Sequence, residues 1–169
     1  VYGLSEAFMA RPTDWPAEAE LTGFWFVDEP VAHVDPALRA FVEQGAPPVC
    51  IGFGSMSTER PEEMSALVLS AAKQVGCRVV LLSGWAGLEA AEVARQGVFV
   101  APQAPHGWLY PRCAAVVHHG GAGTTAAAVR AGVPAVVVPF HGDQPFWASR
   151  VHHLGLGPPP VARSRLTAD

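Results

Sequence analysis

Five short apolar runs set the strongest limit on how this chain can fold, because most of them end at a glycine or proline and are followed by a helical pattern. Runs that stay apolar on both faces are typical of strands buried on both sides in a parallel sheet. The intervening helices supply the crossovers that parallel pairing requires. The sequence therefore predicts an α/β domain with a Rossmann-like, doubly wound parallel sheet. The predicted strands lie within residues 47–56, 77–84, 97–103, 114–120 and 133–140.

Helix signals fall between these strands. The first predicted helix runs from a cap at Asp35, through Pro36 in its first turn, to a stop at Gly45. Three later helices are expected at 87–96, at 124–132 and from an Asp143 cap through 144–155.

One more helix is expected before the second strand, after a cap at Ser57 or Thr58 and up to a stop at Gly76. Its apolar residues recur at a spacing of three and four, as in a helix with one buried face. These residues are Met64, Leu67, Val68, Ala71, Ala72 and Val75.

The domain organisation follows from length and proline content. Residues 1–30 lack helical periodicity and are predicted to form an extended lead-in with one short strand near 21–26. The chain has 169 residues, half of them apolar, which is enough for one well-packed core and short for two. Residues 31–169 are therefore expected to form one domain.

Charge and cysteine usage narrow the function classes. The 11 Lys and Arg residues are scattered and the net charge is −4, so no nucleic-acid partner is expected. No apolar run approaches the roughly 20 residues of a membrane span, and no signal-peptide pattern begins the sequence. Cys50, Cys77 and Cys113 lie far apart among apolar residues, which favours reduced, buried thiols and a cytoplasmic location.

The stretch "HGGAGTT", residues 119–125, is the main candidate for a ligand site. It leads from a strand into a helix N-terminus, where free N–H groups and the helix dipole favour an anion. The Thr124 and Thr125 hydroxyls and His119 can donate further hydrogen bonds. The alternative is a tight turn with Thr124 as an ordinary cap. The spacing matches neither a dinucleotide fingerprint nor a P-loop, so those ligands are disfavoured.

Two smaller features could join this site. Ser55 in "GFGSM" could donate to the same anion, or the stretch could simply end a strand. Asp143 and Gln144 present a carboxylate and an amide that suit the hydroxyls of a polyol, although Asp143 could serve only as a helix cap. Because each feature follows a strand, we expect them to meet at the carboxyl edge of the sheet.

Seven histidines raise the question of a metal site. His118 and His119 should point to opposite sides of their strand, and His152 and His153 are adjacent on a helix without a nearby carboxylate. A metal site is therefore not expected. The segment "APHGWLYP" could place His106 and Trp108 in a pocket, although an aromatic there is more often in the core.

From "VAPQAPHGWLYP" through "HHGGAGTT" to "GDQPFW", the chain resembles the nucleotide-sugar-binding half of the UDP-glycosyltransferases, which have the two-domain GT-B fold. It is most similar to the branch that contains sterol 3β-glucosyltransferases and glycosyltransferases of antibiotics. The stretches "TGFWF", "GFGSM" and "SGWAGL" extend the resemblance over most of the chain. The fold implied is the C-terminal half of GT-B, and the resemblance implies that residues 1–30 are an interdomain lead-in.

The resemblance also implies roles for individual residues. For the sugar hydroxyls it implies Asp143 and Gln144, and for the base and ribose Ala101 and Gln103, with Trp85 as a looser match. The residues implied for the donor diphosphate are Ser55, His119, Gly121, Ala122, Gly123 and Thr124. No catalytic residue is expected in this chain, because the family places the base on its N-terminal acceptor domain.

Three positions depart from the pattern. Val100 stands where plant members stack a Trp on uracil, Ala127 where many hold the ribose with a Glu, and Ala122 where plants have a Trp. Base recognition is thus left open between UDP and TDP.

The activity implied is inverting transfer of a hexose, such as glucose from UDP-glucose or a sugar from a TDP-sugar, to a hydroxyl of a lipophilic small molecule. No metal or cofactor is obligatory in that reaction. Since family members are about twice as long, the chain is expected to be truncated at both ends, to be inactive alone, and to need an N-terminal acceptor domain. Peripheral membrane contact is expected only through the full protein. The alternatives are a donor-binding subunit of a two-chain glycosyltransferase and half of a nucleotide-sugar 2-epimerase.

Overall fold

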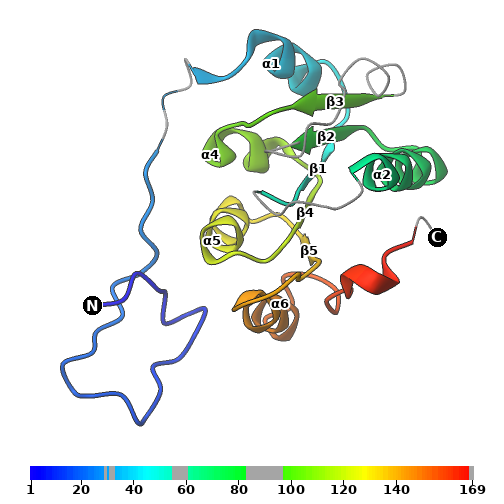
Figure 1. Ribbon diagram of the computed structural model, residues 1–169. Coiled ribbons are helices and arrows are strands. Elements are labelled where there is room, and N and C mark those ends of the chain that lie inside the picture. The colour runs from blue at the N-terminus through cyan, green and yellow to red at the C-terminus, as the bar shows by residue number, and fades with distance from the viewer. Residues whose placement is uncertain (29, 31–32, 55–60, 83–96, 168–169) are drawn as a thin grey trace.

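A computed structural model describes residues 1–28, 30, 33–54, 61–82 and 97–167 (Figure 1). Strands and helices alternate along the domain, as the sequence predicts. The strands are β1 (Val49–Gly52), β2 (Val79–Leu82), β3 (Val98–Ala101), β4 (Ala115–His118) and β5 (Ala135–Val137). The α-helices are α1 (Pro36–Glu43), α2 (Pro61–Val75), α4 (His106–Leu109), α5 (Ala122–Ala131) and α6 (Gln144–His153), and 3-10 turns occur at Tyr110–Arg112 and Arg163–Arg165.

The five strands form one sheet in the order β3-β2-β1-β4-β5, and every pair is parallel. This arrangement confirms the predicted Rossmann-like α/β fold. The chain reverses its direction of winding between β1 and β4, which is where ligands bind in open sheets of this kind. Gly52 of β1 is level with Leu82 of β2 and His118 of β4, so these strands end at a common edge.

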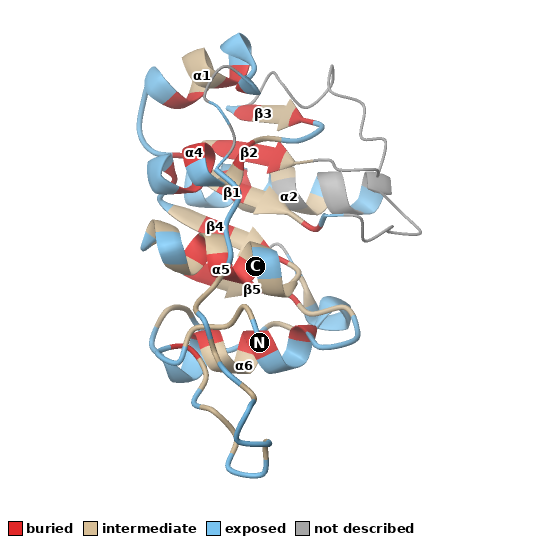
Figure 2. Ribbon diagram, turned by 90° about the vertical axis from the view of Figure 1, so that its left-hand side faces the viewer, coloured by how far each residue is buried: buried red, intermediate tan, exposed pale blue. Residues whose placement is uncertain are grey.

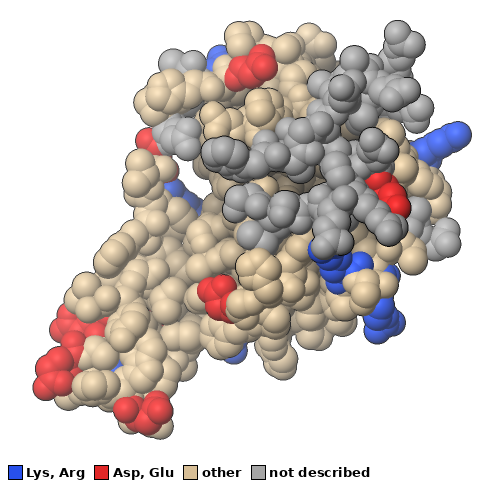
Figure 3. All heavy atoms as spheres, in the orientation of Figure 1, with Lys and Arg blue, Asp and Glu red and all other residues tan. Residues whose placement is uncertain are grey.

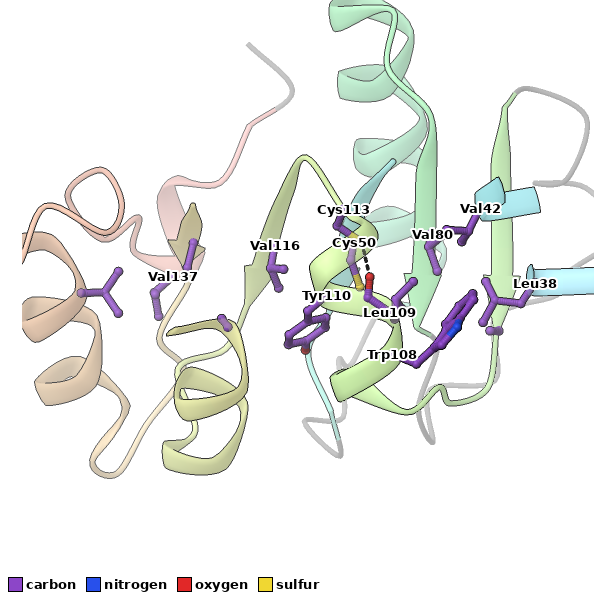
Figure 4. Packing of buried hydrophobic residues seen from close by; sticks show 14 of the residues in the cluster. Leu38, Val42, Cys50, Val80, Trp108, Leu109, Tyr110, Cys113, Val116 and Val137 are labelled. Carbon is purple, nitrogen blue, oxygen red and sulfur yellow. Dashed lines mark hydrogen bonds between the residues drawn. The ribbon is translucent and has the colours of Figure 1, made fainter. Parts of the chain in front are cut away.

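Successive residues of a strand point to opposite sides, so both faces of this sheet carry apolar side chains, and helices cover both faces. Cys50, Val80 and Val116 pack on the side of α1, α4, α5 and α6, whereas Ile51 and the neighbours of Val80 pack on the side of α2. Figure 1 shows these helices on either side of the sheet. On the first side, Trp108 lies next to Leu38 of α1, whereas Tyr110 lies toward α5 (Figure 4).

Local signals explain the helix ends. The Asp35 carboxylate accepts from the Ala37 amide at 2.8 Å and Pro36 occupies the first position of α1, as predicted. Helix α5 begins two residues earlier than predicted, at Ala122, with Gly121 at its N-cap. It ends at Ala131, and its C-cap residue Gly132 has a left-handed φ of +69°, which suits glycine.

Two predictions about these elements are wrong. Val75 was expected on the buried face of its helix but is 76% exposed, because it is the last residue of α2 before Gly76 turns the chain away. In place of the strand expected near 21–26, the structure has a single isolated parallel bridge between Tyr2 and Leu21. The predicted helix at 87–96 and the Ser57 or Thr58 cap lie outside the described residues.

Residues 1–28, the N-terminal segment, run along α5 and α6 and are mostly exposed or half-buried (Figure 2). The segment is held by Phe8, which is buried against Trp147 of α6. The Phe8 carbonyl accepts from the Arg150 guanidinium, with the Nε contact at 2.8 Å. At the end of the segment, the Asp28 carboxylate pairs with Arg130 of α5 at 2.6 Å.

The described residues on the face shown in Figure 3 are largely uncharged. Figure 3 shows acidic side chains over the N-terminal segment at the lower left and basic ones toward the C-terminal end at the right. Within the described residues, no helix combines the length and apolar character that a membrane span needs.

Candidate functional site

A cavity of about 340 Å³ lies at the carboxyl ends of β1, β2, β3 and β4. It is therefore at the switch point between β1 and β4, where the fold places ligands. The residues that line it are Gly52, Gly54, Leu82, Pro102, Gln103, Ala104, His106, Tyr110, His119 and Thr124.

A larger cavity, of about 470 Å³, lies between the N-terminal segment and α5. Its walls are mainly apolar, with Phe8, Phe24 and Phe26 among them. Its cation, Arg130, is already paired with Asp28. Size alone therefore does not select the site, and the smaller cavity has the chemistry that a polar ligand requires.

His119 joins the two loops that close the smaller cavity. A side chain on Gly54, after β1, would lie 3.1 Å from the His119 ring, and one on Gly121, before α5, would lie 2.5 Å from it. Glycine at both positions thus lets the ring fit between the loops. The ring's Nδ1 is buried and has no hydrogen-bond partner among the described residues.

The electrostatics around His119 keep the ring neutral. Burial lowers its pKa most, and His141 lowers it further, against an opposing effect of Asp143. A neutral imidazole has one N–H donor, so His119 can give one hydrogen bond to an anion without carrying a charge of its own.

The N-terminus of α5 faces the same region. Ala122, Gly123 and Thr124 form its first turn, where backbone N–H groups have no acceptor within the helix. Thr124 also lines the cavity, and Gly123 has no neighbouring atom within 4 Å of where a side chain would be, so a ligand can approach its backbone. Free amides at a helix start with the positive end of the dipole suit an anion such as a phosphate.

Asp143 and Gln144, the residues predicted for the sugar, lie near His119 and already make hydrogen bonds within the protein. Asp143 stands at the N-cap of α6, yet its carboxylate makes no cap and instead accepts from the Trp147 indole at 2.7 Å. Gln144 is buried, and its side-chain oxygen accepts from the amides of Phe140 and His141 at 2.7 and 3.1 Å. Asp143 is exposed and can reach a ligand at this edge, whereas Gln144 holds the loop between β5 and α6.

On the opposite side of the cavity, the structure separates the residues predicted for the base and ribose. Gln103 is exposed and lines the cavity, whereas Ala101 is 1% exposed and its side chain belongs to the core. His106 and Tyr110 stack with ring centroids 4.5 Å apart and both line this wall, while Trp108 is core.

Leu82, Ala104 and Tyr110 complete this wall, and no motif pointed to them. Tyr110 could have been found only through its spacing of four residues from His106, which places two rings on one helical face.

Among the described residues, the structure thus brings Gln103, His119 and Thr124 into one cavity, with Gly121, Ala122 and Gly123 at its rim. Ser55 and Trp85 lie outside the described residues. No group of three or more His, Cys, Asp or Glu side chains suitable for a metal occurs in the part of the chain that the structure describes.

Comparisons with known proteins give matches over most of this chain. Residues 66–169 match the family described as Erythromycin biosynthesis protein CIII-like, C-terminal domain. The sterol 3-beta-glucosyltransferase UGT80A2 of Arabidopsis thaliana is 42% identical over 95% of this chain, and the O-mycaminosyltylonolide 6-deoxyallosyltransferase of Streptomyces fradiae is 41% identical over 100% of it. This chain spans only 25% and 39% of those two proteins.

Solved structures give the same result. The glycosyltransferase VinC, determined in complex with DTDP, aligns with 92% of this chain and 38% of its own at a TM-score of 0.70 and 27% identity. The neighbours are GT-B glycosyltransferases, which confirms the fold predicted from the resemblance.

Proposed function

Because this chain belongs to the family of Erythromycin biosynthesis protein CIII-like C-terminal domains of UDP-glycosyltransferases, we propose that it binds the nucleotide-sugar donor of an inverting hexosyltransferase. The donor proposed is UDP-glucose, and the acceptor is a hydroxyl of a lipophilic small molecule. The sterol 3-beta-glucosyltransferase relatives support glucose as the sugar and a lipophilic acceptor. The second candidate donor is a TDP-sugar, which the DTDP complex of VinC supports.

One observation supports the proposal most: the convergence of His119, Thr124 and the first turn of α5 on a cavity at the β1–β4 switch point. A diphosphate in this place would accept hydrogen bonds from backbone amides, a hydroxyl and a neutral imidazole. The base would then lie toward Gln103, His106 and Tyr110, at the far wall of the cavity.

These donors also suit the reaction. In an inverting transfer, a base removes the proton of the acceptor hydroxyl, the oxygen attacks the anomeric carbon, and the bond from that carbon to the diphosphate breaks. Negative charge grows on the departing diphosphate, and fixed donors that face that charge lower the barrier. The base and the acceptor site would come from a part of the protein beyond this chain.

The sugar would lie next to α6. Asp143 is exposed there, and its Oδ2 already accepts from the Trp147 indole, which fixes the carboxylate at the edge of the site. A hexose hydroxyl could donate to the other carboxylate oxygen. Replacing Asp143 with asparagine keeps an acceptor for Trp147 and removes the charge, so UDP-glucose should lose affinity while UDP does not.

Calorimetric titration with UDP, TDP, UDP-glucose and TDP-glucose, with and without EDTA, tests the proposal. We expect saturable binding that survives EDTA and falls at least about tenfold in His119→Ala, since one hydrogen bond to a charged group is lost. His152→Ala, which removes an exposed histidine of α6, is the matched control and should bind normally. Equal binding by the wild type and His119→Ala would reject the site.

A further inference from the structure

The histidine that precedes His119 has no place in the proposed donor contacts, yet it is the more deeply buried of the two. His118 is the last residue of β4 and its side chain is fully buried, at 0% exposure. It points to the other side of the strand, with its ring nearly perpendicular to that of His119 at an interplanar angle of 88°. Full burial of an imidazole is costly unless its nitrogens have a purpose there.

One nitrogen has a clear partner. The Nδ1 of His118 accepts a hydrogen bond from the backbone amide of Gly120 at 3.0 Å. An accepting Nδ1 carries no proton, so the neutral ring must have its proton on Nε2. Protonation would turn Nδ1 into a donor and break this contact. Burial, followed by His119 and His106, lowers the pKa of His118 to about 4, which keeps the ring neutral at physiological pH.

The contact has the form of an Asx turn, in which a side chain accepts from the amide two residues later. Through this contact the Gly120 amide has a hydrogen-bond acceptor within the protein. The amides that follow, from Ala122 to Thr124, are in the first turn of α5 and have no helical acceptor. The Gly120 amide is thus used within the protein, by His118, whereas the amides of Ala122 to Thr124 remain for a ligand.

The other side of the loop is held by packing. Gly120 has a φ of +90°, and a side chain there would lie 2.7 Å from Val137 of β5 and 3.1 Å from the Gln144 carbonyl of α6. The loop backbone is thus fixed between the His118 ring on one side and β5 and α6 on the other.

We propose that His118 is a positioning residue for the diphosphate loop: by accepting from Gly120, it sets the turn that presents His119 and the α5 amides to the donor. This inference rests on the proposed function of the same site. It assigns to His118 a role that acts only through the loop and not by contact with the donor.

Two variants test the proposal. His118→Leu removes the acceptor, whereas His118→Asn supplies an oxygen that can accept from the same amide. We expect UDP affinity to fall about tenfold in His118→Leu, to stay within about threefold of wild type in His118→Asn, and uridine affinity to change in neither. A folded His118→Leu variant that binds UDP like wild type would overturn the proposal.

Nitrogen-15 NMR of the wild-type chain gives a test that does not depend on folding of a variant. The expected spectrum shows His118 with a proton on Nε2, a non-titrating ring between pH 6 and 8, and a Gly120 amide protected from exchange. A proton on Nδ1 would refute the role of His118 even if UDP binds. Absence of UDP binding to the wild type would reject the proposed function instead, so the two failures are distinguishable.

Discussion

Replacing Gly120 with alanine should destabilise this domain more than replacing Gly132 with alanine, although both glycines have a left-handed φ, +90° and +69° respectively. An L-residue in that region costs about 1–2 kcal/mol, and this term applies to both variants. Gly132, at the end of α5, has no atom within 4 Å of the added carbon. Its substitution therefore measures the backbone term alone.

Gly120 has a second, steric cost. Its added carbon would lie 2.7 Å from the Val137 side chain and 3.1 Å from the Gln144 carbonyl, both in packed elements that cannot move freely. Overpacking of this kind typically costs about 1–3 kcal/mol. The expected loss is thus about 2–5 kcal/mol for Gly120→Ala against about 1–2 kcal/mol for Gly132→Ala.

Urea denaturation followed by tryptophan fluorescence measures both losses of unfolding free energy, provided that the slope of this free energy against urea concentration is the same in all proteins. The difference between the two variants is the quantity of interest, because the shared backbone term cancels. If both variants lose the same free energy of unfolding, the loop that contains Gly120 is not packed tightly against β5 and α6, and the account of its rigidity fails.

Three further predictions follow from single contacts. Gln144→Leu removes the acceptor of two loop amides and should cost about 1–3 kcal/mol in urea denaturation, and an unchanged midpoint would contradict the assigned loop contact. Arg150→Met removes the guanidinium that holds the Phe8 carbonyl, so chymotrypsin should cut residues 1–28 faster than in wild type, and equal rates would refute that anchor. His118 has a pKa of about 4 in the folded chain against an ordinary 6.5, so the unfolded state takes up its proton first as the pH falls. Stability should therefore drop between pH 6.5 and 4, by about 3 kcal/mol from this group, and His118→Asn should flatten that part of the profile. Identical pH profiles for the two proteins would contradict the buried, neutral ring.

The sheet and most described helix ends could be predicted because their causes are local. Apolar runs such as 79–82 identify buried strands, and residues such as Asp35, Pro36 and Gly132 fix helix ends through their own backbone preferences. The position of residues 119–125 at the sheet edge followed from the same logic, since any strand of a parallel sheet must deliver its next loop to the common edge.

The directions of the side chains at the site could not be predicted, because they depend on tertiary contacts that the sequence pattern does not show. Asp143 occupies a cap position, but its φ of −84° and ψ of −5° are helical rather than extended, so its carboxylate turns to Trp147 instead of capping α6. Helix α4 has only four residues, too few for a pattern to show that it contributes His106 to the cavity. The sequence did not show that Gln144 also accepts from two loop amides, because those amides come together only in the folded chain.

The central claim is that a nucleoside diphosphate binds at the carboxyl edge between β1 and β4. Titration of nitrogen-15-labelled chain with UDP, followed by amide chemical shifts, tests it most directly. The account predicts the largest shifts at Gly121, Ala122, Gly123 and Thr124, smaller ones at Gln103, and none around the cavity beside the N-terminal segment. Shifts centred on Phe24 and Arg130, with the α5 N-terminus unchanged, would contradict it.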